Sequence, residues 1–144
     1  HMEVNLHAPL LLAKALAAQN LASEGNVVNL LDQRVWKLTP YFLSYTVSKT
    51  GLWTLTRTLA MALAPNIRVN AIGPGPTLPS PRQSDEQFEK QCASTLLQRG
   101  ATTDDICRAV RFILETSSMT GQMIALDGGQ HLAWQTPDVT GGLE

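Results

Sequence analysis

Three side chains, Asp32, Tyr45 and Lys49, carry the groups in this chain that are best suited to acid–base chemistry. Tyr45 and Lys49 are four positions apart, and residues with this spacing share one face of a helix with Cβ atoms about 6 Å apart. At an effective dielectric constant of 20, an ammonium about 5 Å from a phenol stabilises the phenolate by about 3 kcal/mol. We therefore expect Lys49 to lower the pKa of Tyr45 from about 10 toward neutral pH, where the phenol can exchange protons.

The Tyr–Lys pair alone is a weak signal, because a solvated helical tyrosine beside a lysine needs no function. The segments around the Tyr–Lys pair strengthen the functional interpretation. An apolar run, residues 26–31, ends directly before Asp32, thirteen positions ahead of Tyr45. A long apolar helix follows the tyrosine, and a further strand then leads into a Gly/Pro-rich segment, residues 73–77. Strands and loops of this kind can bring a catalytic group and a ligand together.

Composition describes an ordinary single domain. The chain has 144 residues, a net charge of −1 and 44% hydrophobic residues, which is a length that can bury about two-thirds of its unfolded surface. We expect no nucleic-acid partner, since no basic stripe is present, and no membrane span, since no run of 18 apolar residues occurs. The two cysteines lie outside any CxxC motif and the three histidines are scattered, so we expect no metal site. Isolated thiols and the lack of a signal peptide favour a cytoplasmic location.

Helical and strand patterns alternate along the chain. The hydrophobic periodicity and the turn residues predict helices at 2–20, 45–64, 84–98 and 103–115, strands at 26–31, 67–72 and 122–127, and loops at 32–43 and 73–81. Thr102 or Thr103 is expected to cap the last helix. Strands separated by helices pair in parallel through right-handed crossovers, which predicts an open α/β sheet. We assign residues 1–134 to one domain and residues 135–144 to a polar tail.

The predicted sheet is small for an α/β domain. The chain opens in a helix with no strand ahead of it, and the apolar strand at 26–31 would be an exposed edge, which natural proteins avoid. We therefore expect an N-terminal half of the domain to be absent from this chain.

The helices at 2–20 and 45–64 are nearly free of charge. Between Tyr45 and Ala64 the charged residues are Lys49 and Arg57, and in the first helix they are Glu3 and Lys14. Helices that are apolar around most of their circumference are buried on more than one side. Packing within a larger monomer would explain this pattern. We prefer a symmetric interface between copies of these helices, and hence a homodimer or homotetramer.

Four motifs in the same order resemble the C-terminal half of the short-chain dehydrogenase/reductase family. They are the GNVVNLL strand, the Tyr-x-x-x-Lys helix, the NIRVNAIGPG strand and loop, and the closing GQMIALDGG strand, and the likeness extends from about residue 3 to residue 132. The resemblance implies a doubly wound, Rossmann-type sheet whose missing half binds most of the cofactor. It implies an NAD(P)H-dependent oxidoreductase that acts on a small molecule.

The resemblance also implies roles for individual residues. Tyr45 would be the catalytic acid/base, and Lys49 would lower its pKa and hold the nicotinamide ribose. Asn5 would organise a water in a proton relay. Pro74 and Gly75 would pack beside the nicotinamide, and the hydroxyl of Thr77 would reach its carboxamide or the pyrophosphate.

Asp32 departs from the family pattern, which has a serine at this position. An aspartate beside the substrate can protonate a ring nitrogen if burial raises its pKa. The Asp32, Tyr45 and Lys49 combination is similar to that of pteridine reductases and bacterial dihydromonapterin/dihydrofolate reductases, as are the segments SKTGLWTLTRTLAMALAP and LLQRGATTDDICRAV. That branch implies NADPH as cofactor, although nothing in the sequence excludes NADH, because the residues that select the 2′-phosphate belong to the absent half.

Three functional hypotheses remain open at this point. The first is an NADPH-dependent reductase of a pterin or similar heterocycle. The second is a generic NAD(P)H-dependent carbonyl or alcohol oxidoreductase, in which Asp32 is only a loop residue. The third is a non-catalytic fragment that only packs or oligomerises, since a glycine-rich phosphate-binding turn is missing from the sequence. For these 144 residues alone we expect no measurable nucleotide binding.

Overall fold

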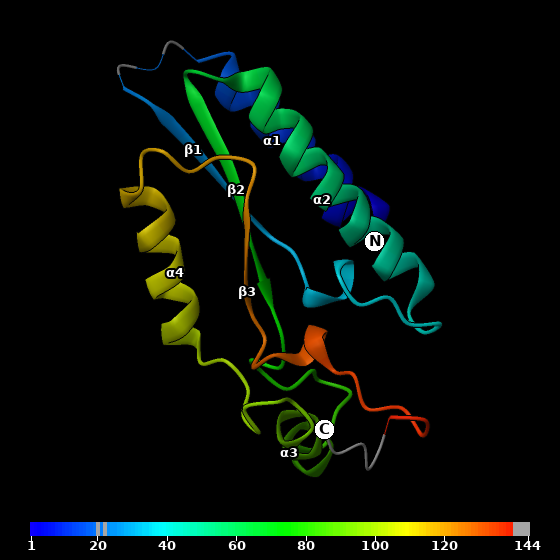
Figure 1. The fold of residues 1–144 in the computed structure, drawn as a ribbon. Coiled ribbons are helices and arrows are strands. Elements are labelled where there is room, and N and C mark those ends of the chain that lie inside the picture. The colour runs from blue at the N-terminus through cyan, green and yellow to red at the C-terminus, as the bar shows by residue number, and fades with distance from the viewer. Residues whose placement is uncertain (20, 22, 140–144) are drawn as a thin grey trace.

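A three-stranded parallel sheet runs through residues 1–19, 21 and 23–139, the part of the chain that the computed structural model describes (Figure 1). Its strands are β1 (Gly25–Leu30), β2 (Ile67–Pro74) and β3 (Met123–Leu126), in the order β1-β2-β3. Gly25 lies opposite Ile67 in the β1–β2 pair, and Ala71 lies opposite Met123 in the β2–β3 pair. The parallel α/β architecture predicted from the sequence is confirmed, and β2 is the central strand.

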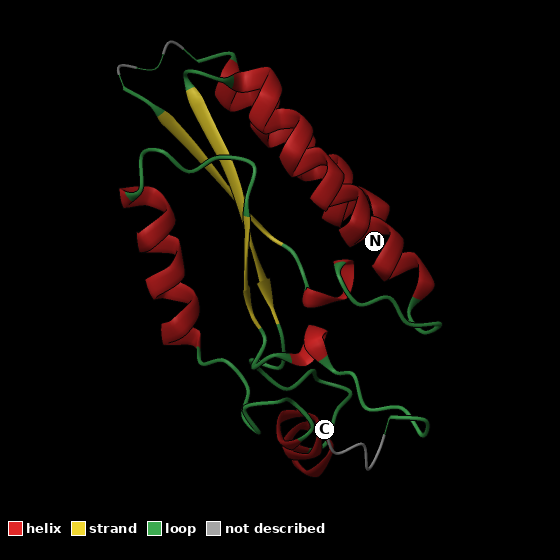
Figure 2. Ribbon diagram, viewed as in Figure 1, coloured by secondary structure: helices red, strands yellow, loops and turns green. Residues whose placement is uncertain are grey.

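Helices cover both faces of this sheet (Figure 2). The helices α1 (Ala8–Ala17) and α2 (Leu43–Leu63) lie together on one face, and α4 (Thr103–Glu115) lies on the other. Buried apolar side chains fill the two layers, with Ala13, Leu59 and Val69 among them on the α1/α2 side and Ile72 and Ile113 on the α4 side. The β-branched and aliphatic residues of β2 are buried on both faces, as expected for a central parallel strand.

Two predicted helices differ from the observed ones in extent. The helix expected at 2–20 begins with a π-helical turn, η1 (Glu3–His7), and its α-helical part ends at Ala17. The helix expected at 84–98 is α3 (Asp85–Ala93). It ends early because the single hydrogen of the buried Thr95 hydroxyl is shared between the carbonyl oxygens of Cys92 and Arg99, at 2.9 and 3.0 Å, and because Gln98 adopts a left-handed φ of 53°. Such competing side-chain bonds do not show in the hydrophobic pattern.

Local hydrogen bonds fix the helix ends near the cavities described below. The Thr102 hydroxyl accepts from Asp105 N at 3.1 Å, and the Asp105 carboxylate accepts from Thr102 N at 2.8 Å. This capping box confirms Thr102 as the predicted N-cap of α4, and Ser84 and Gln87 form the same arrangement at α3. Two short 3-10 turns, η2 (Gln33–Val35) and η3 (Gln130–Leu132), follow β1 and β3.

Arg68 of β2 ties the end of α4 to the sheet. Its side chain is 8% exposed, and it pairs with Glu24 through Nε. The guanidinium donates at 2.9–3.0 Å to four carbonyl oxygens in and just after the last turn of the helix, those of Ile113, Leu114, Thr116 and Met119. The carbonyls of Ile113 and Leu114 belong to the last turn of the helix, where no further N–H follows to bond them, and the buried cation satisfies both. Thr116 O also accepts from Met119 N, and Met119 O also accepts from Asn70 Nδ2.

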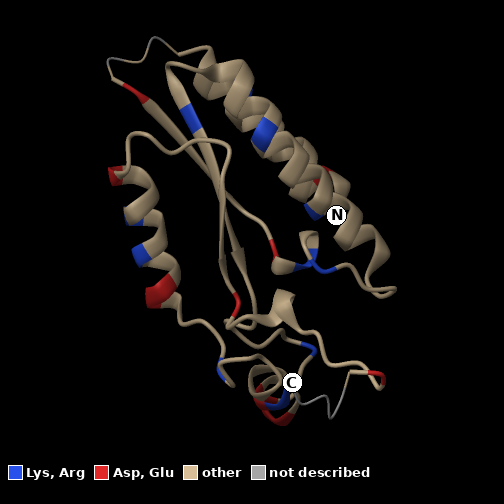
Figure 3. Cartoon of the chain, viewed as in Figure 1, with Lys and Arg blue, Asp and Glu red and all other residues tan. Residues whose placement is uncertain are grey.

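Charged residues are distributed unevenly over the molecule. Figure 3 shows few on α1 and α2 and many more on α3 and α4. The exposed side chains on the first two helices include Leu12, Val47 and Met61. None of the described helices is long and apolar enough to cross a membrane.

Candidate active site

Asp32 and Tyr45 meet at the carboxyl end of β1. The Tyr45 hydroxyl donates a hydrogen bond of 2.9 Å to Asp32 Oδ2. Asp32 Oδ1 accepts from the backbone N–H of Arg34 at 2.8 Å and thereby caps η2. One carboxylate is therefore held by the backbone on one oxygen and by the phenol on the other. The two residues that the sequence placed thirteen positions apart are in direct contact.

The pKa of Tyr45 moves opposite to the expectation. Burial raises the pKa of the phenol well above its ordinary value, and the charge of Asp32 and its hydrogen bond raise it further, while the charge of Arg34 lowers it. The expected lowering by Lys49 is therefore wrong for this structure. The Lys49 ammonium lies 5.8 Å from the centre of the Tyr45 ring and is directed at a different oxygen. The phenol is therefore neutral and keeps its proton at neutral pH.

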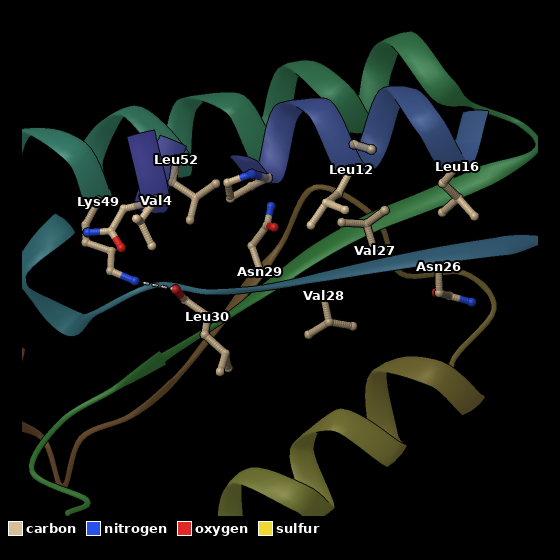
Figure 4. A pocket seen from close by; sticks show the side chains of 13 residues that line it. Val4, Leu12, Leu16, Asn26, Val27, Val28, Asn29, Leu30, Lys49 and Leu52 are labelled. Carbon is tan, nitrogen blue, oxygen red and sulfur yellow. Dashed lines mark hydrogen bonds between the residues drawn. The ribbon is translucent and has the colours of Figure 1, made fainter. Parts of the chain in front are cut away.

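Lys49 follows Tyr45 by one turn on α2 and reaches the end of β1. Its Nζ donates to the carbonyl oxygen of Leu30 at 2.7 Å, the dashed contact in Figure 4. Burial lowers the pKa of Lys49, and the nearby charge of Asp32 raises it. Because an ammonium has three hydrogens and Leu30 accepts one, donors remain for a ligand. Lys49 also lies at one end of a cavity of about 380 Å³ that runs between the first helix and β1 (Figure 4).

Asn5 is connected to the site through the backbone. Its Nδ2 donates to the hydroxyl of Ser48 at 3.0 Å, and that hydroxyl donates to the carbonyl oxygen of Tyr45 at 2.7 Å. The residue lies in the π-helical turn η1, a local feature often found at functional sites. The structure thus brings Asn5 to the helix that carries Tyr45, without direct contact between Asn5 and the Asp32–Tyr45 pair.

Pro74, Gly75 and Thr77 line a cavity of about 620 Å³ together with Asp32 and Tyr45. The loop runs close to the end of β3: a Cβ atom on Gly75 would lie 2.7 Å from Asp127 Cα. The Thr77 hydroxyl donates to Gly75 O at 3.1 Å, so its hydrogen is directed into the loop and only its oxygen can accept from a ligand.

A further part of the wall of this cavity comes from the loop after β2 and from α3. It includes Gln83, Phe88 and Gln91, and the Gln83 side-chain amide donates to that of Gln91 at 2.9 Å. These residues are far from Tyr45 in the sequence, and the fold brings them to the same cavity. In the described part of the chain, no group of three or more His, Cys, Asp or Glu side chains is placed to hold a metal ion.

The geometry defines a Rossmann-type half domain with an acid–base pair at the end of a parallel strand. A family model described as enoyl-(acyl carrier protein) reductase matches residues 1–131. The short-chain dehydrogenase/reductase homologue YusR of Bacillus subtilis is 38% identical over 91 residues, which are 62% of this chain and 70% of YusR. The chain belongs to the short-chain dehydrogenase/reductase family.

Two further proteins are similar over nearly the whole chain. The crystal structure of the FolM alternative dihydrofolate reductase 1 from Brucella suis in complex with NADP superposes with a TM-score of 0.94 at 57% identity, covering 97% of this chain and 57% of that one. Dihydromonapterin reductase of Citrobacter koseri is 28% identical over 135 residues, 91% of this chain and 56% of its own length. The chain spans about half the length of most of the curated relatives it matches.

Proposed function

We propose that the full-length protein is an NADPH-dependent oxidoreductase that reduces a pterin or similar heterocycle. The observation that carries the proposal is the 2.9 Å hydrogen bond from Tyr45 to Asp32 within a cavity large enough for a ring system. The likeness to proteins named dihydrofolate reductase and dihydromonapterin reductase supports this substrate class. The NADP in the Brucella structure supports the phosphorylated nucleotide, although NADH stays open.

The chain's own groups fit the nicotinamide end of such a nucleotide. Lys49 is half-buried with donor hydrogens left for ribose hydroxyls, and Pro74 and Gly75 line the same cavity as Tyr45. A dinucleotide bound here would supply a hydride.

Proton delivery is the part of the reaction that this chain would perform. The raised pKa keeps the proton on Tyr45 Oη, which points to Asp32 Oδ2. A pterin nitrogen placed beside this oxygen pair can take the proton from the phenol. The phenolate that is left then takes a proton from solvent water, and Asp32 favours this step because its charge and its hydrogen bond raise the pKa of Tyr45. Asn5, which reaches Tyr45 O through Ser48, would hold the helix end and a water in place.

The experiment compares full-length wild type with Asp32→Asn in NADPH oxidation by dihydrobiopterin. We expect a rate loss of about 100-fold, the usual effect of a lost acid–base group. The matched control is Asp104→Asn, since Asp104 is exposed on α4, pairs with Arg108 and does not line the cavity. Equal rates for wild type and Asp32→Asn would remove the proposed role of Asp32.

A carbonyl reductase is the second candidate, favoured by the family's usual serine at this position. It predicts turnover of simple ketones and full activity of Asp32→Ser. Ketone reduction that exceeds dihydrobiopterin reduction, with no loss in Asp32→Ser, would replace the pterin proposal.

We further propose that the protein is a cytoplasmic homodimer or homotetramer built through α1 and α2. The exposed apolar side chains of these helices support it, as does an apolar cavity of about 510 Å³ on α2 lined by Leu38, Leu43 and Val47. Light scattering of the full-length protein measures its molar mass and so tests the proposed oligomer. The mass of a monomer at micromolar concentration would contradict the proposal.

A further inference from the structure

A separate cavity of about 340 Å³ adjoins the acid–base pair on the side of η2. Asp32 and Tyr45 form part of its lining, so it shares both residues with the larger cavity. Its other lining residues are His1, Arg34, Phe42 and Arg82. Two arginines, the imidazole of His1 and the phenyl ring of Phe42 therefore lie beside the groups proposed to protonate a pterin.

Arg34 is held over an aromatic ring in this cavity. Its guanidinium carbon lies 4.8 Å from the centre of the Phe42 ring, and Nη1 donates a long hydrogen bond of 3.4 Å to Thr39 Oγ1. Stacking on an aromatic face positions a guanidinium while leaving its in-plane donors available. Arg34 is close enough to Tyr45 that its charge lowers the pKa of the phenol.

Phe42 adopts an uncommon backbone conformation. It lies at the N-cap of α2 with φ 57° and ψ 46°, and its side chain is 67% exposed. A bulky residue in the left-handed region costs about 1 kcal/mol or more, and such strain is concentrated at ligand sites. The conformation presents a large apolar ring to solvent at the cavity wall, where a planar group can stack on it.

Arg82 brings a second positive charge from a distant segment. It lies in the loop between β2 and α3, and its guanidinium, like that of Arg34, forms no ion pair with a carboxylate among the residues the structure describes. Asp32 contributes one negative charge to the lining, and Arg34 and Arg82 contribute two positive charges. The cavity therefore favours an anionic, partly aromatic group.

We propose that this cavity binds the tail of a folate-type substrate, with Phe42 against the aminobenzoyl ring and Arg34 and Arg82 on the glutamate carboxylates. The inference rests on the proposed pterin reduction and narrows it. A dihydropterin whose ring lies beside Tyr45 extends its side chain into a neighbouring space, and planar guanidinium groups match carboxylates in two-point contacts. The arginines are specificity residues for the tail, and neither of them gives or takes the transferred proton.

The test compares kcat/KM for dihydrofolate and for dihydrobiopterin, which has a small uncharged side chain, in the full-length protein. The double variant Arg34→Gln/Arg82→Gln is expected to lose about tenfold or more with dihydrofolate beyond any loss with dihydrobiopterin, because two charge-assisted contacts disappear only with dihydrofolate. The effect of the Arg34 charge on the pKa of Tyr45 is common to both substrates. Arg57→Gln is the matched control, since Arg57 also stacks on an aromatic ring, that of Trp53 at 5.7 Å, but lies outside the cavity. It should leave both substrates unaffected.

The possible results separate the two proposals. An equal loss with both substrates, or no loss with either, overturns the tail site while pterin reduction stands. A rise in the KM for NADPH alone would assign the arginines to the nucleotide and also overturn it. If wild type reduces neither pterin, the proposed function has failed, and the tail site fails with it.

Discussion

Replacing Arg68 by methionine should destabilise the full-length protein by about 3 kcal/mol. The change removes one buried cation that donates to the four carbonyls at the end of α4 and pairs with Glu24. Methionine retains most of the apolar volume, so the expected loss is mainly that of hydrogen bonds.

The magnitude follows from the carbonyls that lose a donor. Thr116 O still accepts from Met119 N and Met119 O still accepts from Asn70 Nδ2, so the loss falls mainly on Ile113 O and Leu114 O. Hydrogen bonds to a charged group contribute about 1.5–3 kcal/mol each. Three of the four carbonyls share the two hydrogens of Nη1, so the bonds are not all full-strength. Glu24 is 42% exposed and regains water after the change. Removing a buried charge also recovers some desolvation energy, which brings the net estimate to about 3 kcal/mol.

The assay is urea unfolding of wild type, Arg68→Met and Arg68→Lys, followed by circular dichroism at equal protein concentration. Lysine keeps the charge but has fewer donors in a different geometry, so we expect an intermediate midpoint. A loss below about 1 kcal/mol for Arg68→Met, or identical midpoints for the two variants, would refute this reasoning about the α4 end.

Two more predictions concern the site. In a spectrophotometric titration, the difference between wild type and Tyr45→Phe isolates the ionisation of Tyr45. We expect no ionisation of Tyr45 at pH 10 in the wild type. In Asp32→Asn the ionisation should move to lower pH, because a charge and a hydrogen bond that raise the pKa of Tyr45 are lost. The pKa of tyrosine in the unfolded chain is about 10, and the pKa of Tyr45 is higher in the folded protein. Its contribution to the free energy of unfolding is therefore fully present below about pH 10 and is lost as the pH rises above that value. Ionisation of Tyr45 below pH 10 would contradict the raised pKa. Gly75→Ala should cost about 1–3 kcal/mol, because the new methyl group meets the backbone of Asp127 at 2.7 Å. Gly73→Ala should cost less, since its nearest neighbour is the flexible Met123 side chain, and equal melting temperatures for the two variants would argue against this packing.

Local patterns predicted the elements and part of the site. The spacing of apolar residues predicted the strands, and the capping threonine predicted the start of α4. The i, i+4 spacing correctly placed Tyr45 and Lys49 on one helix. Spacing does not say which oxygen a flexible ammonium will reach. Lys49 bonds to Leu30 O, and the effect on Tyr45 therefore comes from burial and Asp32.

The remaining parts of the site depend on contacts between distant segments. Arg82 and Phe42 meet at one cavity although forty positions separate them, and neither has a local motif. The strained conformation of Phe42 is also invisible in the sequence, because left-handed residues are expected at glycine or asparagine. Such features require the fold.

The central claim is that Asp32 and Tyr45 deliver a proton as one unit. A double-mutant cycle with Tyr45→Phe and Asp32→Asn on kcat/KM for dihydrobiopterin tests it most directly, because groups that act together show strongly non-additive losses. We predict that the double variant is about as slow as the slower single variant. Losses that multiply would show that the two residues act independently, and would contradict the account.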